Sequence, residues 1–587
     1  ANVKNGSLKE KSGFVLNELK GDAVYNDKMI KLANFILKTP NTTIENATEL
    51  NFTSMEDLTK HPERVKLSLN FKNTTIGLKD AAFFSDAVPA NYRNEKIKLN
   101  ADVNGYLNNL NIPRLQISGL KNTQIDISGK AKGLPDINKT YLDLNIKKLY
   151  LTKSDILVAV PKKSLPPSIE LPNVINAKGN FKGSMTDFNT NMNIQTDMGA
   201  AVLSAAMKGP KGRENYKANV SLNNFNVGRL LKMQPKLGRV SVKADVVGTG
   251  LDPKKINAKF NAKVLSAYYN KYTYRNLSLA GNYSNQKVNI KSSMPDSNAN
   301  FNLVANVNLA GKYPAVKADL NLKQVNLQAL NFSPTVLSAA GVVKVDLQTA
   351  DVDYLNGSVD VTGLQLVKDQ QRINVDTIFV RAKSSATANE LTLKSEILSA
   401  QVDGKYQLSQ VGNAIINEIN KYYAFGKVTK IPDQRLRFAV QVYDSKLLKQ
   451  FVPELTVFKP SQFYGLIDTQ KDSLQIQGNF PQIVYGEYKV DSTRLDINND
   501  NNKIDYGLTV KSMQSPSIAL FNTEISGEAA NNNLGVNIFL RDRQLKNKYV
   551  IGGTFQSIQK DYKFSLDPQK LLLDYEKWTV SPENYIQ

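Results

Sequence analysis

The sequence contains no cysteine, one histidine and one tryptophan in 587 residues. Without cysteine there is no disulfide, no thiolate metal site and no cysteine nucleophile, and this absence suits export through an oxidising compartment. The single histidine, His61, precedes Pro62 in a connection, so multi-histidine metal sites are excluded and triad chemistry has one candidate base. Paired carboxylates are not excluded, because their separation is spatial. We therefore expect no enzymatic activity, no metal and no cofactor.

Long apolar runs are also missing. No stretch approaches eighteen consecutive apolar residues, so no segment of the sequence is predicted to span a bilayer as a helix. The first residues, "ANVKNGSLKEKSG", contain no apolar signal segment, and the last, "KLLLDYEKWTVSPENYIQ", stop within a strand pattern. We expect the natural chain to extend beyond both ends.

Acidic residues are outnumbered, and the formal net charge is +22. The lysines stand mostly singly along alternating segments such as "VKADLNLKQV" and "INAKFNAKV". A solvated outer sheet face explains this spacing, since alternate strand positions must be polar where one face meets water. Attraction to anionic lipid headgroups is the second interpretation. We do not expect nucleic acid as a partner.

What the sequence does contain is alternation of apolar and polar residues from Val65 to about Leu566. Val240, Val242, Ala244 and Val246 are one example of the period of two that predicts a β-strand. Helix patterns are few and short, which argues against parallel crossovers because each needs a dozen or more residues. The sequence predicts an all-β fold with a mainly antiparallel or solenoid-like sheet.

Short helix patterns recur between strand runs, with predicted centres at Ala82, Asp155, Arg229, Ala329 and Leu448. They divide the chain into an N-terminal β segment at 1–60 and groove repeats at 61–150, 151–225, 226–325, 326–440 and 441–587, the last including the start of a truncated C-terminal region. One longer helix is predicted at 409–426, with Ser409 as cap and Gly426 at its end.

The 409–426 helix presents Ile415, Ile419 and Tyr422 on one face. Two interpretations remain open for it. It is a helix laid over an apolar surface or sheet edge, or it narrows the opening of a groove as a gate.

The apolar faces of so many strands need a cover. A second sheet, a closed barrel or a filled solenoid would each provide one. These strands favour Ala, Val, Leu and Ile over larger side chains, which favours a curved and incompletely filled interior. An ordinary closed core without ligand is the alternative. The predicted lining residues are Val242, Leu279, Ile290, Leu303, Val307, Leu309, Val316, Leu320, Leu322, Val345, Leu347, Leu393 and Phe438.

The chain resembles the TamB branch of the AsmA-like family. The resemblance rests on "SGFVLNELKGDAVYNDKMIKLANFILKTPNTTI" at 12–44, on the long Asn-rich alternating strands, on the recurring strand, short helix and strand order, and on "LLLDYEKWTVSPENYIQ" at the end. It covers essentially the whole chain, but its motifs are loose patterns.

This resemblance implies a long twisted sheet curled into an open, taco-like repeating β-groove, punctuated by short helices. It implies a periplasmic protein that carries phospholipids between the inner and outer membranes and supports outer-membrane protein assembly. Its ligand would be phospholipid acyl chains. Its partners would be the inner membrane, through an N-terminal helix missing here, and an outer-membrane barrel protein of the TamA type, through a missing C-terminal region.

Several local patterns have simpler interpretations than function. "DINNDNNKIDYG" at 496–507 has alternating acids, but Asn501 and Gly507 stand where a calcium-binding EF-hand needs Gly and Glu, so we predict a polar hairpin loop. Thr53 to Glu56 is a predicted capping box, and Trp578 is expected to pack on a strand. The rival functions are an adhesive or structural β-solenoid or sandwich array with a filled core and a polysaccharide-acting enzyme.

Overall fold

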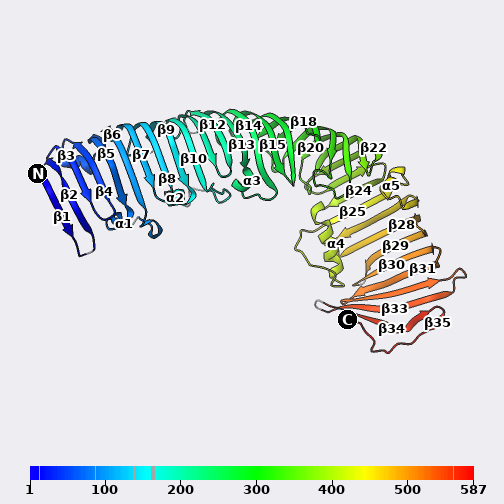
Figure 1. Ribbon diagram of the computed structural model, residues 1–587. Coiled ribbons are helices and arrows are strands. Elements are labelled where there is room, and N and C mark those ends of the chain that lie inside the picture. Colours follow the sequence, from blue (N-terminus) through cyan, green and yellow to red (C-terminus); the bar gives the residue numbers. More distant parts are fainter. Residues whose placement is uncertain are drawn as a thin grey trace. The chain divides into compact units, whose positions relative to one another are not determined.

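The computed structural model describes residues 1–11, 13–85, 88–136, 139–159, 166–210, 212–500, 502–558 and 561–586. These residues form 35 strands of one antiparallel sheet that does not close (Figure 1). The prediction of an all-β, antiparallel, open sheet with a few short helices is confirmed. The chain divides into two compact units, residues 1–299 with 329–331, and residues 300–328 with 332–587.

In the first unit each strand pairs with the next along the chain, from β1 through to β17. Its strands are β1 (Asn2–Lys9), β2 (Val15–Asn26), β3 (Met29–Lys38), β4 (Thr43–Asn51), β5 (Lys66–Gly77), β6 (Lys96–Tyr106), β7 (Asn109–Gly119), β8 (Thr123–Lys132), β9 (Tyr141–Thr152), β10 (Val174–Gly183), β11 (Phe188–Thr196), β12 (Gly199–Lys208), β13 (Asn215–Asn226), β14 (Leu237–Thr249), β15 (Asn257–Tyr269), β16 (Tyr272–Ser284) and β17 (Lys287–Pro295).

The second unit repeats this order with one exception. Strand β25 pairs with β27 and not with the short β26. Both β26 and β27 pair with the next strand, β28, at different parts of its length. The strands are β18 (Ala299–Asn308), β19 (Ala315–Asn326), β20 (Leu337–Thr349), β21 (Asn356–Lys368), β22 (Gln371–Ser384), β23 (Asn389–Lys394), β24 (Leu398–Lys405), β25 (Arg435–Val442), β26 (Leu455–Phe458), β27 (Ser461–Asp468), β28 (Ser473–Tyr485), β29 (Tyr488–Asp500), β30 (Lys503–Gln514), β31 (Ala519–Ala530), β32 (Asn533–Arg541), β33 (Asn547–Ile558), β34 (Asp561–Leu573) and β35 (Glu576–Lys577).

The helices are short and lie in the connections. They are α1 (Leu78–Ala81), α2 (Lys153–Ala159), α3 (Val227–Leu230), α4 (Val411–Asn420) and α5 (Lys446–Phe451), with single 3₁₀ turns η1 (Met55–Leu58), η2 (Pro62–Arg64), η3 (Ala90–Tyr92) and η5 (Leu408–Gln410). Four of the five predicted helix centres are confirmed at or beside α1, α2, α3 and α5, whereas Ala329 lies in a turn. Among the described residues no helix is long and apolar enough to cross a bilayer.

Asparagine bends several of these strands. A left-handed residue sits inside a strand at each of four positions, with φ between 41° and 50°. At each of them the pairing register shifts, as in a β-bulge, which bends the strand and increases its twist. Asparagine tolerates this conformation better than β-branched residues do. The four residues are Asn34, Asn73, Asn224 and Asn522.

The six-segment division of the chain stays a prediction, although α2, α3 and α5 begin within a few residues of three of its boundaries. The longer helix differs from its prediction. Helix α4 begins at Val411 and ends at Asn420, not at 409 and 426. Ser409 does not cap it, because the Ser409 backbone N–H and hydroxyl donate to the Asp353 carboxylate at 2.8 and 2.9 Å.

Candidate functional site: an uncovered apolar sheet face

Apolar side chains form continuous rows across the strands of the first unit. Residues directly opposite each other on antiparallel strands point to the same face, so pairing registers define each row. One row crosses β5 to β16 and contains a single polar residue. Its members are Thr74, Leu99, Ile117, Ile125, Leu149, Ala177, Ile194, Ala201, Leu222, Val242, Val264 and Leu277.

The second unit has a longer row of the same kind, from β19 to β34. Its members are Ala318, Val345, Val359, Val380, Leu393, Ala400, Val440, Phe463, Gly478, Leu495, Leu508, Ile525, Ile538, Ile551 and Leu571. Fourteen of these fifteen residues carry an apolar side chain, and the remaining one is Gly478. We call the sides of the sheet that carry these rows the apolar faces of the two units.

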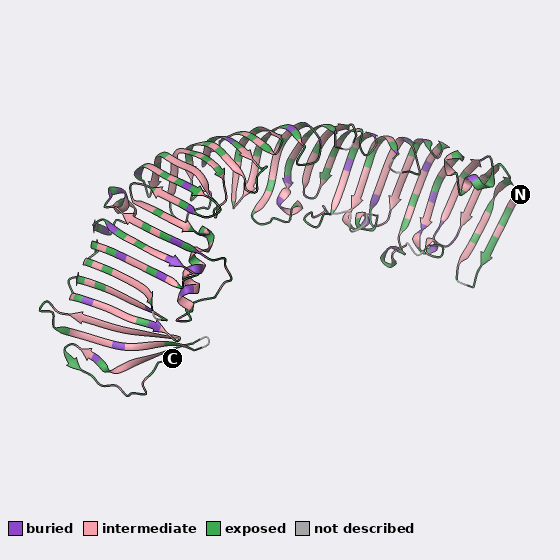
Figure 2. Cartoon of the chain, turned by 180° about the vertical axis from the view of Figure 1, so that it is seen from behind, coloured by how far each residue is buried: buried purple, intermediate pink, exposed green. Residues whose placement is uncertain are grey.

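The apolar faces are not sealed by a second layer of the described chain. Thr74, Ala177, Gly478 and Leu571 are buried, but the other leucine, isoleucine, valine and phenylalanine side chains of both rows keep intermediate exposure. Figure 2 shows this intermediate class along most of the strand residues, with buried residues sparse. Side chains between two packed sheets are normally buried. A filled sandwich does not account for this pattern.

The opposite face is polar. In the first unit the neighbouring row, which points to the other side of the sheet, includes Ser221, Lys243, Lys263 and Ser278 on β13 to β16, and each of them pairs directly with the next. Both lysines are exposed. The lysine spacing in the sequence therefore reflects a solvated outer face, as predicted.

Most predicted lining residues lie on the apolar faces. Val242, Val345 and Leu393 belong to the rows above, and the others pair with apolar neighbours on the same side or alternate with exposed residues. This group comprises Leu279, Ile290, Leu303, Val307, Val316, Leu320, Leu322, Leu347 and Phe438. Leu309 is the exception, because it follows the end of β18 and its side chain is 45% exposed in the connection. Their role in binding lipid stays a prediction.

Helix α4 covers one part of the apolar face of the second unit. Beneath it lie Leu436, Ile467 and Leu474, which are adjacent in the pairing of β25, β27 and β28 and are at most 1% exposed. Ile415 and Ile419 of α4 and Tyr422 in the turn after the helix pack against this cluster, while their role as a gate stays a prediction. The rows farther from α4 stay partly exposed. The helix is therefore a partial cover placed at one end of these strands.

A charged group fastens the C-terminal end of α4. The Lys421 ammonium lies 2.8 Å from the Glu418 carboxylate and also contacts Asp472 in the turn between β27 and β28. Burial raises the pKa of the Glu418 carboxyl, although the Lys421 ammonium opposes this shift. Tyr422 accepts hydrogen bonds from Asn499 through its hydroxyl at 3.1 Å and from Asn532 through its carbonyl at 2.8 Å. These contacts hold the helix against the sheet.

Buried carboxylates hold the short helices to the strand ends of the first unit. Asp155 of α2 accepts hydrogen bonds from the Thr123 hydroxyl at 2.7 Å, the Tyr92 hydroxyl at 2.8 Å and two backbone N–H groups of the β7–β8 turn. Asp80 of α1 accepts in the same way from the hydroxyls of Thr39 and Thr42, which lie in the turn between β3 and β4. Each carboxylate thus joins a helix to an earlier hairpin.

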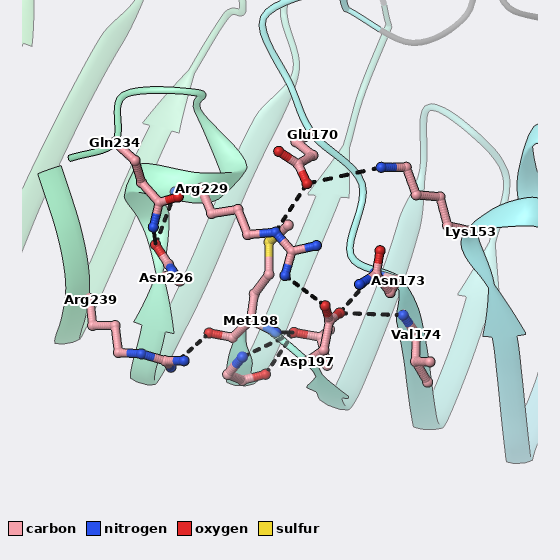
Figure 3. Close-up of polar contacts among 12 residues, drawn as sticks. Lys153, Glu170, Asn173, Val174, Asp197, Met198, Asn226, Arg229, Gln234 and Arg239 are labelled. Carbon is pink, nitrogen blue, oxygen red and sulfur yellow. Dashed lines mark hydrogen bonds and ion pairs between the residues drawn. The ribbon is translucent and has the colours of Figure 1, made fainter.

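At α3 an arginine has this role (Figure 3). The Arg229 guanidinium donates to Glu170 at 3.0 Å and to Asp197 at 2.8 Å, and Asp197 also accepts the Asn173 N–H at 2.8 Å. Burial alone would raise the pKa of Asp197, but the Arg229 guanidinium and the backbone N–H groups lower it below its usual value. Asn226 caps α3 by accepting the Arg229 backbone N–H at 2.9 Å.

Sequence reasoning missed the exposed apolar side chains of these connections. Phe84 beyond α1 is 76% exposed, and Leu231 and Met233 beyond α3 are 40% and 47% exposed. The apolar pairs in "DAAFFSD" and "GRLLKMQ" were the available signal, because such residues in a connection have no strand face to occupy.

Three local predictions have outcomes in the structure. The carboxylate that caps η1 is Asp57, which accepts the Thr53 and Ser54 N–H groups, so the predicted Thr53 to Glu56 box was displaced by one residue. Trp578 is 56% exposed and follows β35, so its predicted strand packing was wrong. The hairpin at 496–507 is confirmed, but β29 continues to Asp500.

His61 stands before η2, and its Nδ1 atom lies 3.3 Å from the Glu63 carboxylate. No group of three or more His, Asp or Glu residues in the described part of the chain is arranged to hold a metal ion. Comparison of the chain with protein-family models and with curated protein sequences finds no match. The TamB resemblance therefore continues as a proposal.

Proposed function

We propose that this protein is a non-enzymatic conduit along which phospholipid acyl chains move. The observation that supports the proposal best is the pair of apolar rows, which cross twelve strands in one unit and fifteen in the other while their side chains stay partly exposed. A solvated polar face on the other side of the sheet keeps such a molecule soluble.

An apolar face would lower the free-energy barrier to lipid movement, because exposing hydrocarbon to water is costly. Each methylene moved into water costs about 0.8 kcal/mol, so a tail of about fourteen carbons costs on the order of 11 kcal/mol. An apolar face removes most of this barrier. Fifteen strands at about 4.8 Å give roughly 65 Å of row, which is several times the depth of one lipid leaflet of about 15 Å. A tail would therefore find many nearly equivalent positions.

The cellular location and the partners that we propose are those implied by the family resemblance. We propose a periplasmic protein, anchored in the inner membrane in its full-length form, that supplies phospholipid to the outer membrane and supports protein assembly there. Its partners would be the two membranes and a barrel protein of the TamA type. No energy-coupling motif stands in the sequence, so direction would come from elsewhere.

A charge placed on the apolar face tests the proposal. Leu320→Arg puts a guanidinium among Val343 and Val361, and Asn321→Arg puts the same group on the opposite, exposed face. We expect both variants to fold, as judged by circular dichroism. Only Leu320→Arg should lose lipid transfer between vesicles, by about tenfold or more, because an arginine inside hydrocarbon is costly.

The alternative is a structural or adhesive array with a filled core. The fully buried cluster beneath α4 favours it locally. It predicts no copurifying lipid in native mass spectrometry, and gross unfolding of Leu320→Arg and of the milder Leu320→Gln. Lipid-free protein together with unaltered transfer in Leu320→Arg would overturn the conduit proposal.

A further inference from the structure

A hollow of about 720 Å³ lies at the strand ends of the first unit, away from the short helices described above. Seven successive strands, β9 to β15, contribute to its lining. This volume is within the usual range for small-molecule sites. The hollow is therefore large enough for the headgroup and glycerol region of a lipid.

Four lysines line the hollow. Three of them, Lys182, Lys217 and Lys259, belong to one row on the polar face across β10 to β15. Lys208 lies near this row, at the end of β12. The members of the row are Lys182, Asn189, Ala206, Lys217, Val247 and Lys259. Lys182 is paired with Asp143 at 3.0 Å. Lys208, Lys217 and Lys259 make no ion pair with any residue that the structure describes. Asp187 is the one acid in the lining.

The positive charge surrounds apolar groups. Val247 stands between Lys217 and Lys259 in the row, and its side chain is 52% exposed, while Ala206 is the neighbour on the other side of Lys217. Tyr141, 39% exposed, closes one end of the lining. Val247 is therefore an apolar side chain left half exposed on the polar face of the sheet. An apolar floor with a cationic rim fits an amphiphile better than it fits a free anion.

The spacing suits one phosphate group. Lys217 and Lys259 are two strands apart, so their Cα atoms are separated by roughly 10 Å. Two flexible lysine side chains can converge on an anion from that distance, each with three donors. We propose that this hollow binds the phosphate of an anionic phospholipid headgroup, held by Lys217 and Lys259 with Val247 beneath its glycerol region. This site is separate from the apolar face and does not depend on the conduit proposal.

Isothermal titration with lipid analogues tests the site. The three probes are a short-chain phosphatidylglycerol below its micelle concentration, the phosphatidylcholine with the same tails, and inorganic phosphate. We expect phosphatidylglycerol to bind at least about tenfold more tightly than either of the others. Lysine acetylation read by mass spectrometry should show Lys217 and Lys259 protected by phosphatidylglycerol.

Two charge-reversed variants distinguish a built site from general attraction. Lys217→Glu with Lys259→Glu should weaken phosphatidylglycerol binding at least about tenfold. Lys243→Glu with Lys263→Glu makes the same change in net charge on the same polar face and should change binding less than about twofold. All four lysines are exposed, so both proteins are expected to fold.

Equal weakening by the two variants would overturn the proposal, because it would indicate attraction by net charge alone. Tight binding of inorganic phosphate would overturn the amphiphile assignment. Equal binding of phosphatidylcholine would show that the lysines are not recognising the anion. Leu320→Arg lies in the other unit and should leave this binding unchanged, so failure of this site and failure of the conduit proposal are separable.

Discussion

At the scale of single residues, this fold depends on a few groups that a strand pattern does not require. Buried carboxylates such as Asp155 are surrounded by donors, and certain glycines occupy places where neighbouring backbone leaves no room for a side chain. Both kinds of residue fix where one hairpin meets the next. Their substitution should therefore act locally and be measured locally.

Asp155→Asn should loosen the β7–β8 turn at neutral pH. Burial alone would raise the pKa of Asp155, but hydrogen bonds from Thr123, Tyr92 and its other donors lower it below its usual value. A lowered pKa means that the stabilisation is present above about pH 4 and is lost as pH falls through the lower, folded value. Losing hydrogen bonds to a charged group should cost roughly 1.5–3 kcal/mol.

Hydrogen exchange at the Lys121 and Asn122 amides, which donate to Asp155, provides the measurement. Their protection should fall in Asp155→Asn at pH 7, and the difference between the two proteins should shrink as the pH falls through the lowered pKa of Asp155. Asp143→Asn, a half-exposed carboxylate of β9 that is paired with Lys182 and does not contact the β7–β8 turn backbone in this way, is the control. Equal protection of the wild type and Asp155→Asn at pH 7 would contradict the prediction.

Gly179→Val should separate β10 from β11. Gly179 has φ +152°, and a Cβ atom there would stand 1.9 Å from the Asn191 carbonyl oxygen. That contact is with backbone, so the strands must move apart, at a cost of roughly 3 kcal/mol or more. Trypsin should then cleave after Lys178 and Lys182. Gly507→Val, where a Cβ meets open space, should stay resistant.

At the scale of elements, the short helices are positioned by side-chain contacts and not by their own stability. An isolated helix of ten residues, the length of α4, is marginal in water. Packing stabilises this short helix, because the apolar face of α4 covers Leu436, Ile467 and Leu474. The gate hypothesis for α4 depends on whether this cover can lift.

Ile419→Asp should uncover the cluster beneath α4. A carboxylate facing Leu436, Ile467 and Leu474 would be desolvated without a partner, so the helix should detach. We expect greater binding of an environment-sensitive hydrophobic dye. Gly412→Asp adds the same charge near the start of α4, where a Cβ meets open space, and should leave dye binding unchanged. If α4 acts as a gate, lipid transfer should also change in Ile419→Asp alone.

At the scale of the whole molecule, the alternation of apolar and polar residues predicts the fold class, because a period of two places alternate side chains on opposite faces of a β-strand. It also assigns faces, and residues such as Val345 and Leu393 lie where that assignment places them. The ends of strands were harder to predict from the sequence. Leu309 continues the alternation in the sequence, but β18 ends at Asn308.

The register between strands could not be predicted at all. The row of Leu495, Leu508 and Ile525 exists because the two hairpins formed by β29, β30 and β31 have compatible turn lengths and bulges, and this is a property of pairing rather than of any one segment. The lysine-lined hollow was hidden for the same reason. Lys182, Lys217 and Lys259 are far apart in the sequence and become neighbours only through five successive pairings.

Consecutive pairing has a consequence for how such a chain can change its length. From β1 to β17 each strand needs only its predecessor as a template, so a duplicated hairpin inserted between two others would restore both the direction and the facing of everything after it. A single added strand would reverse the direction of all that follow and carry each connection to the opposite margin. This architecture can therefore lengthen only by pairs of strands.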